Sequence, residues 1–362
     1  MAQPSRQSSG NCIPIVDFGA FLDGETEEQE RVAREIDEAF RTVGFVYLKN
    51  HGVPKEKVEE CFEWSKKFFA LPVETKMLAP HPPGGAHHRG YSPPGLEHVT
   101  QHTYDKEDVA KSREIPDYKE SYESGNVNDE SQPNIWLPED KLPGFRPFLE
   151  SYFTLCNNLI HKVLDALSIA LSVPAPGLSP THSQSLFQLR LLHYPAIEAE
   201  QLKNGKRNRI NAHSDFGTMT LLFQDQVGGL EIEDPNHPGT FHRAGAVEDA
   251  VLLNIGDLMA RWSNDRWKST VHRVGLPPPR TLKIPGHGVN TEGTRMEATV
   301  VEVPHEEGAI VPDRYSIPFF ATADMNTVID ALPGCWGEGN PKRYEPVTAW
   351  GYLQMRMAML YD

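Results

Sequence analysis

The chain has 362 residues and a formal net charge of −15, with 35 Lys and Arg against 50 Asp and Glu. This length is ample for a large buried core and is common for one β-rich domain with added helices. An acidic chain disfavours nucleic acid as a partner. No apolar run approaches the roughly 18 residues that a membrane-spanning helix needs, so a membrane partner is not expected either.

The elements predicted for the N-terminal half are mostly helical. Residues 1–11 are rich in Ser and Gln and are expected to be disordered. Apolar residues at helical or strand spacing predict a helix over 26–43, a buried strand over 45–48, a helix over 55–69 and a long supporting helix over 145–171. Thr26 and Gln29 form a capping-box pattern at the start of the first helix.

Residues 81–94 are rich in Pro, Gly and His and are predicted to form a loop. This loop contains three histidines, which are side chains that can bind a metal ion: His81, His87 and His88. Because they lack the regular spacing of a strand or a helix, we favour a mobile segment over a metal site.

From residue 185 onward, short β-type runs alternate with turns. This pattern is typical of a double-stranded β-helix, which is a jelly-roll-like barrel. We therefore predict a mixed α/β fold with a β-rich core. Its expected parts are an N-terminal region of helices and strands over 12–184, the barrel over 185–345 and a C-terminal helix over 346–362.

The four cysteines are widely spaced and form no C-x-x-C pair: Cys12, Cys61, Cys156 and Cys335. This spacing argues against a structural zinc site. The chain also begins without a signal-like apolar segment. We therefore expect a reducing, cytoplasmic location, a small molecule as the partner, and an oligomeric state that the sequence leaves open.

Two motifs in the predicted barrel supply a candidate metal site. His213 and Asp215 form a His-x-Asp pair, and His272 follows much later in S-T-V-H-R-V. Residues i and i+2 of a strand point to the same face, so His213 and Asp215 can reach one ion together. A closed β architecture can bring His272 to them. Two imidazoles and one carboxylate form the facial triad that binds Fe(II) and leaves positions open for a co-substrate and O₂.

A third motif, Arg314-Tyr315-Ser316, offers a guanidinium and a hydroxyl group, which suit a dicarboxylate. A His-x-Asp pair alone is a weak signal, because its histidine can be an ordinary strand residue. The ordered set His-x-Asp, His and Arg-x-Ser, each within an apolar β-like run, favours the metal site. We therefore interpret the chain as an Fe(II)- and 2-oxoglutarate-dependent oxygenase.

Further short motifs follow one another along the chain. In the first half they are I-P-I-V-D-F at 13–18, G-F-V-Y-L-K-N-H-G-V at 44–53, F-F-A-L-P at 68–72, R-G-Y at 89–91 and K-E-S-Y at 119–122. In the second half they are L-R-L-L-H-Y-P at 189–195, H-S-D-F-G-T-M-T-L-L-F-Q-D at 213–225, G-G-L at 228–230, N-I-G-D-L at 254–258 and R-W-S-N-D at 261–265. In this order they resemble the isopenicillin N synthase-like branch of the Fe(II)/2-oxoglutarate-dependent dioxygenases over nearly the whole chain. The second half is similar to the fungal thymine dioxygenases of that family.

The resemblance implies that Tyr194, Arg314 and Ser316 hold 2-oxoglutarate, next to Fe(II) and with O₂ as the oxidant. The implied reaction couples decarboxylation of 2-oxoglutarate to oxidation of a C–H bond, by hydroxylation or by desaturation or ring rearrangement. The protein's task is then to aim one C–H bond at the oxidant and to exclude unproductive oxidation.

The resemblance also suggests three substrate contacts: Arg190, Phe216 and Phe320. An aromatic pair with an arginine can enclose a flat, oxygen-rich ring and hydrogen-bond its carbonyl groups. The two phenylalanines can equally be core residues. Arginine in an apolar strand is seldom buried without a partner, so the functional interpretation is stronger for Arg190.

The stretch between His272 and Arg314 is much longer than the turn that usually joins these strands in the family. Residues 277–312 are first rich in Pro and Gly and then alternating, which predicts a long loop plus an added strand. A role as a lid or in substrate selectivity is as plausible as a passive surface excursion. The insertion argues against assigning thymine as the substrate by analogy with the similar family members. We therefore expect a small secondary metabolite as the substrate.

Three alternatives stay open from the sequence. The chain can be a thymine-type methyl hydroxylase. It can also be an oxidase of the same fold that takes all its electrons from the substrate and needs no 2-oxoglutarate. Finally, it can be a non-catalytic binding protein built on the same barrel, although the intact ligand set argues against this.

Overall fold

The computed structural model describes residues 13–83, 87–96, 117–203, 207–284, 299–303, 305–306 and 308–361. The segment 1–11, for which disorder is predicted, lies outside these residues, as does Cys12. The other three cysteines are buried free thiols. Within the described part of the chain, no helix is long and apolar enough to cross a membrane.

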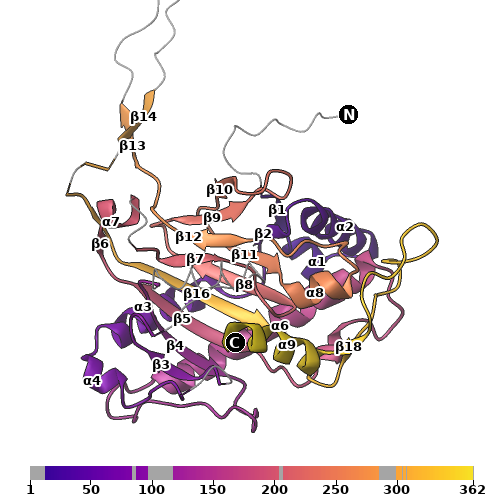
Figure 1. Ribbon diagram of the computed structural model, residues 1–362, viewed down its shortest axis with the longest axis horizontal. Coiled ribbons are helices and arrows are strands. Elements are labelled where there is room, and N and C mark those ends of the chain that lie inside the picture. Colours follow the sequence, from indigo (N-terminus) through magenta and orange to yellow (C-terminus); the bar gives the residue numbers. More distant parts are fainter. Residues whose placement is uncertain are drawn as a thin grey trace, which may run out of the picture.

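The core is a large sheet that faces a smaller one (Figure 1). The large sheet has eight strands in the order β1-β2-β11-β8-β16-β5-β4-β3. Their bounds are β1 Ile15–Asp17, β2 Phe45–Lys49, β11 Ala250–Ile255, β8 Met219–Gln224, β16 Arg314–Ala321, β5 Gln188–Tyr194, β4 Glu120–Gly125 and β3 Gly90–Ser92. The smaller sheet has the order β10-β9-β12-β7. Its strands are β10 Phe241–Arg243, β9 Leu230–Glu233, β12 His272–Val274 and β7 Ile210–His213.

Strands from the N-terminal half flank the large sheet on both edges. β2 pairs with β11, and β4 pairs with β5, both antiparallel. The predicted barrel and the N-terminal region therefore share one continuous hydrogen-bonded sheet. This arrangement brings residues of β4 to the same surface as the candidate site residues of β5 and β16.

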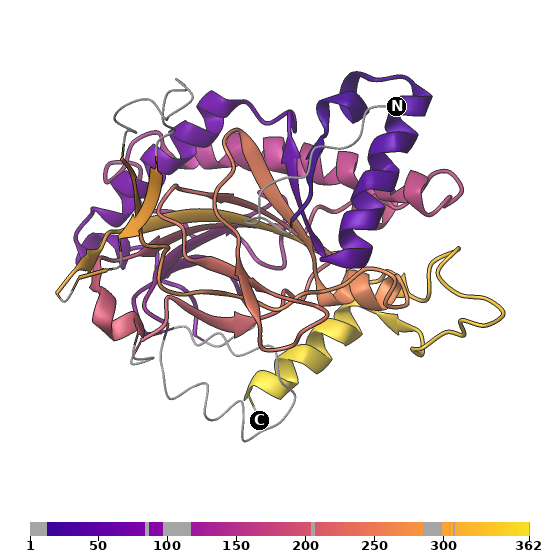
Figure 2. The same ribbon diagram turned by 90° about the horizontal axis from the view of Figure 1, so that it is seen from above.

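Helices cover the outer face of the large sheet (Figure 2). The main ones are α2 Thr26–Thr42, α3 Lys55–Phe69 and α6 Phe145–Ala170. Shorter helices elsewhere in the fold are α1 Gly19–Asp23, α4 Val73–Lys76, η1 Ser179–His182, α7 Ala199–Lys203 and α8 Asp257–Trp262. The helix α9 Ala349–Tyr361 follows near the C-terminus. The apolar stripe of α6 packs on the sheet, with Phe153 of α6 and Phe319 of β16 at a ring-centroid distance of 5.1 Å. Burial of this stripe stabilises the helix against the sheet.

Local differences from the sequence predictions have simple causes. The predicted helices agree with α2, α3, α6 and α9 to within a few residues. The capping box is wrong, because α2 begins at Thr26 itself and its N-cap Glu25 makes no side-chain cap hydrogen bond. Gln29 donates to the Phe21 carbonyl instead. The predicted loop at 81–94 contains β3, which pairs with β4.

The insertion at about 277–312 contains an antiparallel hairpin of β13 Arg280–Ile284 and β14 Thr299–Val303. The added strand was predicted only for the alternating second part, so the prediction of a loop over 280–284 is wrong. The hairpin projects away from the two sheets (Figure 1). Two further small pairs complete the structure, β15 Ile310–Val311 with β6 Ile197–Glu198, and β17 Val328–Ile329 with β18 Val347–Thr348.

Candidate functional site

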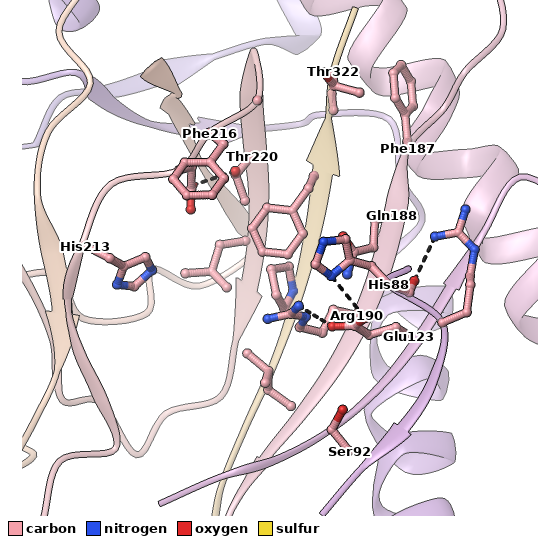
Figure 3. Close-up of a pocket in the computed structure, with 18 of the residues that line it drawn as sticks. His88, Ser92, Glu123, Phe187, Gln188, Arg190, His213, Phe216, Thr220 and Thr322 are labelled. Atoms are coloured by element: carbon pink, nitrogen blue, oxygen red, sulfur yellow. Dashed lines mark hydrogen bonds and ion pairs between the residues drawn. The ribbon is translucent and has the colours of Figure 1, made fainter. Parts of the chain in front are cut away.

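One cavity of about 920 Å³ contains every residue that the sequence predicted for the site. These residues come from both sheets and from the turn after β7: His213, Asp215, His272, Arg314, Ser316, Tyr194, Arg190, Phe216 and Phe320. Figure 3 shows part of the lining, with His213 on one side and Arg190, Glu123 and His88 on the other. The cavity has the size of a typical small-molecule site.

The predicted metal ligands converge at one end of the small sheet. His213 ends β7 and His272 begins β12, and the two are directly paired across the strands. Their ring centroids lie 4.3 Å apart. His272 Nε2 lies 3.9 Å from Asp215 Oδ1, and one ligand atom from each of the three residues lies within 4.8 Å of the others. This grouping suits three ligands on one face of a single ion.

Backbone carbonyls orient both imidazole rings. His213 Nδ1 lies 2.8 Å from the Asn211 carbonyl oxygen, and His272 Nδ1 lies 3.2 Å from that of Thr270. When Nδ1 carries the proton and donates to the carbonyl, the lone pair is on Nε2. This tautomer is the usual one for a histidine that binds a metal through Nε2.

The Asp215 carboxylate is oriented in the same way. Its Oδ2 accepts hydrogen bonds from Thr220 Oγ1 at 2.6 Å and from Asn254 Nδ2 at 2.8 Å. Its Oδ1 is the oxygen that faces His272. Two hydrogen bonds on one oxygen thus hold the other toward the histidines. Asn254 lies in the N-I-G-D-L motif, to which the sequence interpretation assigned no role.

Electrostatics favour the protonation states that a divalent ion requires. Burial, together with the neighbouring His272, lowers the pKa of His213 to about 3. For Asp215, burial opposes ionisation, but the two histidines and the hydrogen bonds from Asn254 and Thr220 prevail and lower the pKa of its carboxyl group. A neutral His213 beside an ionised Asp215 fits Fe(II), because metal ligands must be deprotonated. The donor set present therefore suits the ion.

The second predicted group lies across β16 and β5. Arg314 and Tyr194 are paired residues of these strands, and the guanidinium carbon lies 4.9 Å from the tyrosine ring centroid. Arg314 is buried and donates to Ser316 Oγ at 3.2 Å and to Gln224 Oε1 at 3.3 Å. Its buried Nε has no partner within the described residues. Because a buried donor without a partner is costly, this guanidinium suits an anionic ligand in the cavity.

Arg209 was not predicted as part of this region. It belongs to the basic run 203–209, but it is fully buried and its guanidinium lies 5.8 Å from the Tyr194 ring. Burial, together with the nearby Arg314, lowers its pKa to about 10. Its place in a basic run gave no signal of this burial, because charged residues of such runs are mostly exposed.

The three predicted substrate contacts have different surroundings. Arg190 of β5 forms an ion pair with Glu123 of β4, and its guanidinium lies 5.5 Å from the Phe320 ring centroid. Phe216 lies under Arg356 of α9 at 4.5 Å, so it contacts the C-terminal helix as well as the cavity. Both phenylalanine side chains therefore line the cavity rather than the interior of a layer.

Comparison with known proteins agrees with this geometry. Residues 13–139 match the model of the N-terminal region of "non-haem dioxygenase in morphine synthesis", and residues 186–323 match the 2OG-Fe(II) oxygenase superfamily. The chain is 35% identical to the 2-oxoglutarate-dependent dioxygenase gloF of Glarea lozoyensis, over 97% of this chain and 99% of that protein. It is 36% identical to the proline hydroxylase buaE of Petromyces alliaceus, over 96% and 99% of the two chains.

Solved structures give the same result. The full-length thymine-7-hydroxylase of Neurospora crassa in complex with alpha-KG matches with a TM-score of 0.79 and 35% identity, over 97% of this chain and 98% of that one. The same protein with alpha-KG and thymine matches with a TM-score of 0.78 and 36% identity, with the same coverage of both chains. The chain thus belongs to the 2OG-Fe(II) oxygenase superfamily, with a double-stranded β-helix fold, and is an Fe(II)- and 2-oxoglutarate-dependent dioxygenase that oxidises a small substrate.

Proposed function

We propose that His213, Asp215 and His272 hold the Fe(II) ion of this enzyme. The observation that carries the proposal is the convergence of two carbonyl-oriented imidazoles and one carboxylate oxygen on a single point of the cavity wall. Three protein ligands leave coordination positions for 2-oxoglutarate and O₂. Bound there, the iron supplies the oxidation of a C–H bond that this family performs.

Arg314, Ser316 and Tyr194 are proposed to hold the carboxylate of 2-oxoglutarate that is remote from the iron. Arg314 is positioned by its bonds to Ser316 and Gln224, so a ligand meets a preorganised guanidinium. A charge-assisted contact of this kind fixes the co-substrate relative to the metal ligands. Arg209 adds a second buried positive charge near the Tyr194 ring.

Arg190, Phe216 and Phe320 are proposed to contact the substrate. Arg190 is held by Glu123 and offers donors to carbonyl or carboxylate oxygens, while the two phenylalanines enclose an apolar or flat part. The relatives include one named for proline and one solved with thymine. Because both of these names refer to small molecules, we propose a small secondary metabolite as the substrate. A thymine-type methyl hydroxylase is the second candidate.

We also propose a role for each region of the chain. Residues 185–345 form the catalytic barrel, residues 12–184 support it and close one side of the cavity through β4, and residues 346–362 form a covering helix. Buried free thiols and an oxygen-reactive ferrous site fit a reducing, cytoplasmic location, which we propose for the protein.

An anaerobic titration with Fe(II) and 2-oxoglutarate tests the metal and co-substrate sites together. The expected result is the weak visible charge-transfer band of the 2-oxoglutarate chelate in the wild type and its absence in His213→Ala. Arg314→Ala should retain iron but require about 10- to 100-fold more 2-oxoglutarate, the equivalent of one charge-assisted hydrogen bond. Arg273→Ala is the matched control, because Arg273 lies beside His272 but pairs with Glu231 outside the cavity.

This titration, followed by an assay of turnover in the presence of O₂, separates the alternatives. A chain that binds iron but gives no band, and forms product without 2-oxoglutarate, is an oxidase of this fold. Release of succinate during turnover excludes a purely binding function. Unchanged turnover in His213→Ala or Asp215→Ala would contradict the assignment of the metal ligands.

A further inference from the structure

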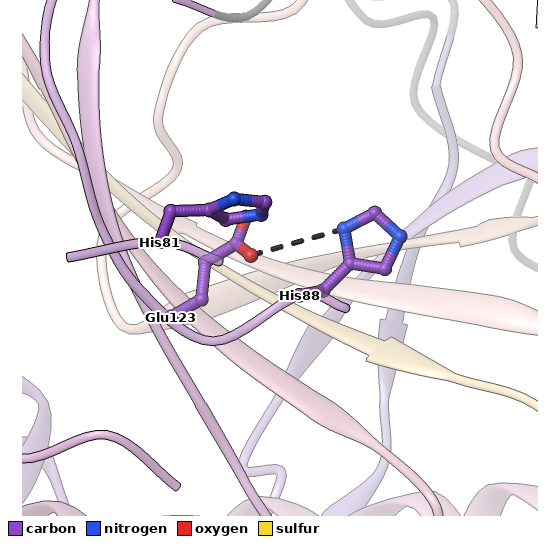
Figure 4. Close-up of side chains that lie close together, drawn as sticks. All are labelled: His81, His88 and Glu123. Atoms are coloured by element: carbon purple, nitrogen blue, oxygen red, sulfur yellow. Dashed lines mark ion pairs between the residues drawn. The ribbon is translucent and has the colours of Figure 1, made fainter. Parts of the chain in front are cut away.

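A second group of potential metal ligands lies in the same cavity, away from the proposed iron ligands. His81, His88 and Glu123 place one ligand atom each within 4.8 Å of the others (Figure 4). All three residues line the cavity. From the sequence, the histidines of this loop were expected to belong to a mobile segment, and Glu123 was not considered with them.

Glu123 is the fully buried member of this group. Its Oε1 faces the Arg190 guanidinium in an ion pair. Its Oε2 accepts no hydrogen bond from any residue that the structure describes. A buried carboxylate oxygen without a partner is costly, because it has lost its water without replacement. This oxygen therefore points to a ligand.

His88 Nδ1 lies 3.8 Å from Glu123 Oε2. This distance is too long for a hydrogen bond. It is about half an ångström longer than the roughly 3.3 Å that separates two tetrahedral ligand atoms lying about 2 Å from one ion, so a small side-chain adjustment brings both atoms to a shared ion. The backbone of His88 is anchored on both sides, since its N–H donates to Gln132 Oε1 at 3.2 Å and its carbonyl accepts from Arg89 Nη1 at 2.8 Å. The imidazole is thus attached to a positioned backbone.

His81 and Glu123 also have the outer contacts that metal ligands usually have. His81 Nδ1 lies 2.7 Å from the Pro82 carbonyl oxygen, which leaves Nε2 as the lone-pair nitrogen when Nδ1 carries the proton. The Arg190 ion pair holds the other Glu123 oxygen, Oε1. Carbonyl partners for histidine and hydrogen-bonded carboxylates are typical of the outer shell of a metal site.

We propose that His81, His88 and Glu123 bind a divalent transition-metal ion of the zinc class, distinct from the Fe(II) of the facial triad. Two imidazoles and one carboxylate form a three-ligand set with an open fourth position. Because the ligands line the cavity, the open position faces the space that the substrate occupies. The ion satisfies the Glu123 oxygen and presents a Lewis acid to an oxygen-bearing group of the substrate.

The local charges permit this ion. Glu123 provides one negative charge and the two imidazoles bind in the neutral form, so the ion and its three ligands carry about one net positive charge. Arg190, which shares the Glu123 carboxylate, adds a second positive charge. Arg89 is adjacent, but its own charge is matched by Asp129 at 2.9 Å. Together with Arg190, the loaded wall then favours a substrate whose nearby end is anionic or rich in oxygen.

Zinc stoichiometry on the metal-free full-length chain tests the proposal without any need for the substrate. Equilibrium dialysis against Zn²⁺, read by elemental analysis, should give two equivalents for the wild type. His88→Ala and Glu123→Gln should each lose one equivalent. Asp215→Ala should lose the other, and Asp215→Ala/His88→Ala should retain none. His87→Ala is the matched control, because His87 is exposed in the same loop and lies outside the ligand group; it should retain two equivalents.

The outcomes separate this site from the proposed iron site. One equivalent in the wild type that is lost in Asp215→Ala and retained in His88→Ala would overturn the second site and leave the facial triad intact. One equivalent with the opposite dependence would support the second site and contradict the triad. Circular dichroism of each variant shows whether a loss of zinc follows from unfolding, and Glu123→Gln, which preserves shape, keeps the test valid if an alanine variant fails to fold.

Discussion

At the scale of single residues, the metal ligands depend on groups that touch no metal themselves. Asp215 can present Oδ1 to the histidines because Thr220 and Asn254 occupy Oδ2. The rings of His213 and His272 are held by the carbonyl oxygens of the residues two positions earlier, Asn211 and Thr270. Such outer contacts help a three-ligand site to keep its geometry when other ligands bind at or leave the open coordination positions of the metal.

Asn254→Ala is therefore expected to weaken Fe(II) binding by about 10- to 100-fold without removing a ligand. The carboxylate loses one of two donors on Oδ2 and can rotate. The measurement is an anaerobic Fe(II) titration compared with the wild type. Asn264→Ala serves as the control, because Asn264 is equally buried but donates to the Cys335 and Pro341 carbonyls. Equal iron affinity in Asn254→Ala and the wild type would contradict the positioning role.

At the scale of elements, the C-terminal helix α9 is coupled to the metal-binding turn. Arg356 of α9 pairs with Asp257 of α8 at 2.7 Å, and Asp257 also accepts from Ser214 Oγ at 3.0 Å. Burial raises the pKa of Asp257, although Arg356 acts in the opposite direction. Trp350 and Leu353 of the same helix line the cavity. The helix thus closes the cavity and holds the residue next to Asp215.

Arg356→Ala is expected to lower the free energy of unfolding by about 3–5 kcal/mol, because it leaves Asp257 buried without its cation. Arg343→Ala is the matched control, since its pair with Asp265 is largely exposed and should contribute less than about 1 kcal/mol. Urea denaturation at neutral pH measures both. A loss in Arg356→Ala no larger than in Arg343→Ala would show that the pair does not anchor α9.

The hairpin of β13 and β14 is the second element with a testable role. We propose that it selects substrates, because in the chain it is inserted between β12, which carries His272, and β16, which carries Arg314. Replacing residues 280–303 by a short Gly-Ser turn should change which compounds stimulate succinate release. Iron binding should stay the same, since the three ligands lie outside the segment. An unchanged substrate profile would show that the hairpin is a surface feature without a role in substrate selection.

At the scale of the whole molecule, buried histidines link stability to pH. Burial lowers the pKa of His51 to about 4 and that of His182 to about 3. The unfolded chain takes up protons on these rings below about pH 6.5, whereas the folded chain does so only near the lowered values. The free energy of unfolding should therefore fall as the pH decreases from about 6.5 to about 3, and this contribution levels off below that range.

Urea denaturation of the metal-free protein at several pH values between 7 and 5 measures this dependence. His182→Gln should flatten the slope by up to about 1.4 kcal/mol per pH unit, which corresponds to one proton. His237→Gln is the control, because the His237 side chain is 74% exposed. A slope in His182→Gln equal to that of the wild type would mean that His182 does not contribute.

Much of the architecture was determined by local sequence patterns. The helices α2, α3 and α6 follow from apolar residues at helical spacing. This pattern is local, so a short window within each segment is enough to recognise it. The His-x-Asp spacing needs only the two-residue repeat of a strand, and the order of the motifs identified the family that the relatives confirm. The direction of these side chains into one cavity agrees with that interpretation.

Only the tertiary structure decided which distant residues meet. Glu123 lies on β4 and His88 in a preceding loop, and the pairing of β3 with β4 brings them together. Asn254 reaches Asp215 because β11 and β8 are neighbours, and Arg209 is buried although it ends a run of basic residues. Periodicity reports which face of a segment is apolar, but a buried polar residue is stabilised by partners whose distance along the chain carries no pattern. Such partners can be identified only from the folded structure, in which the pairing of the strands is known.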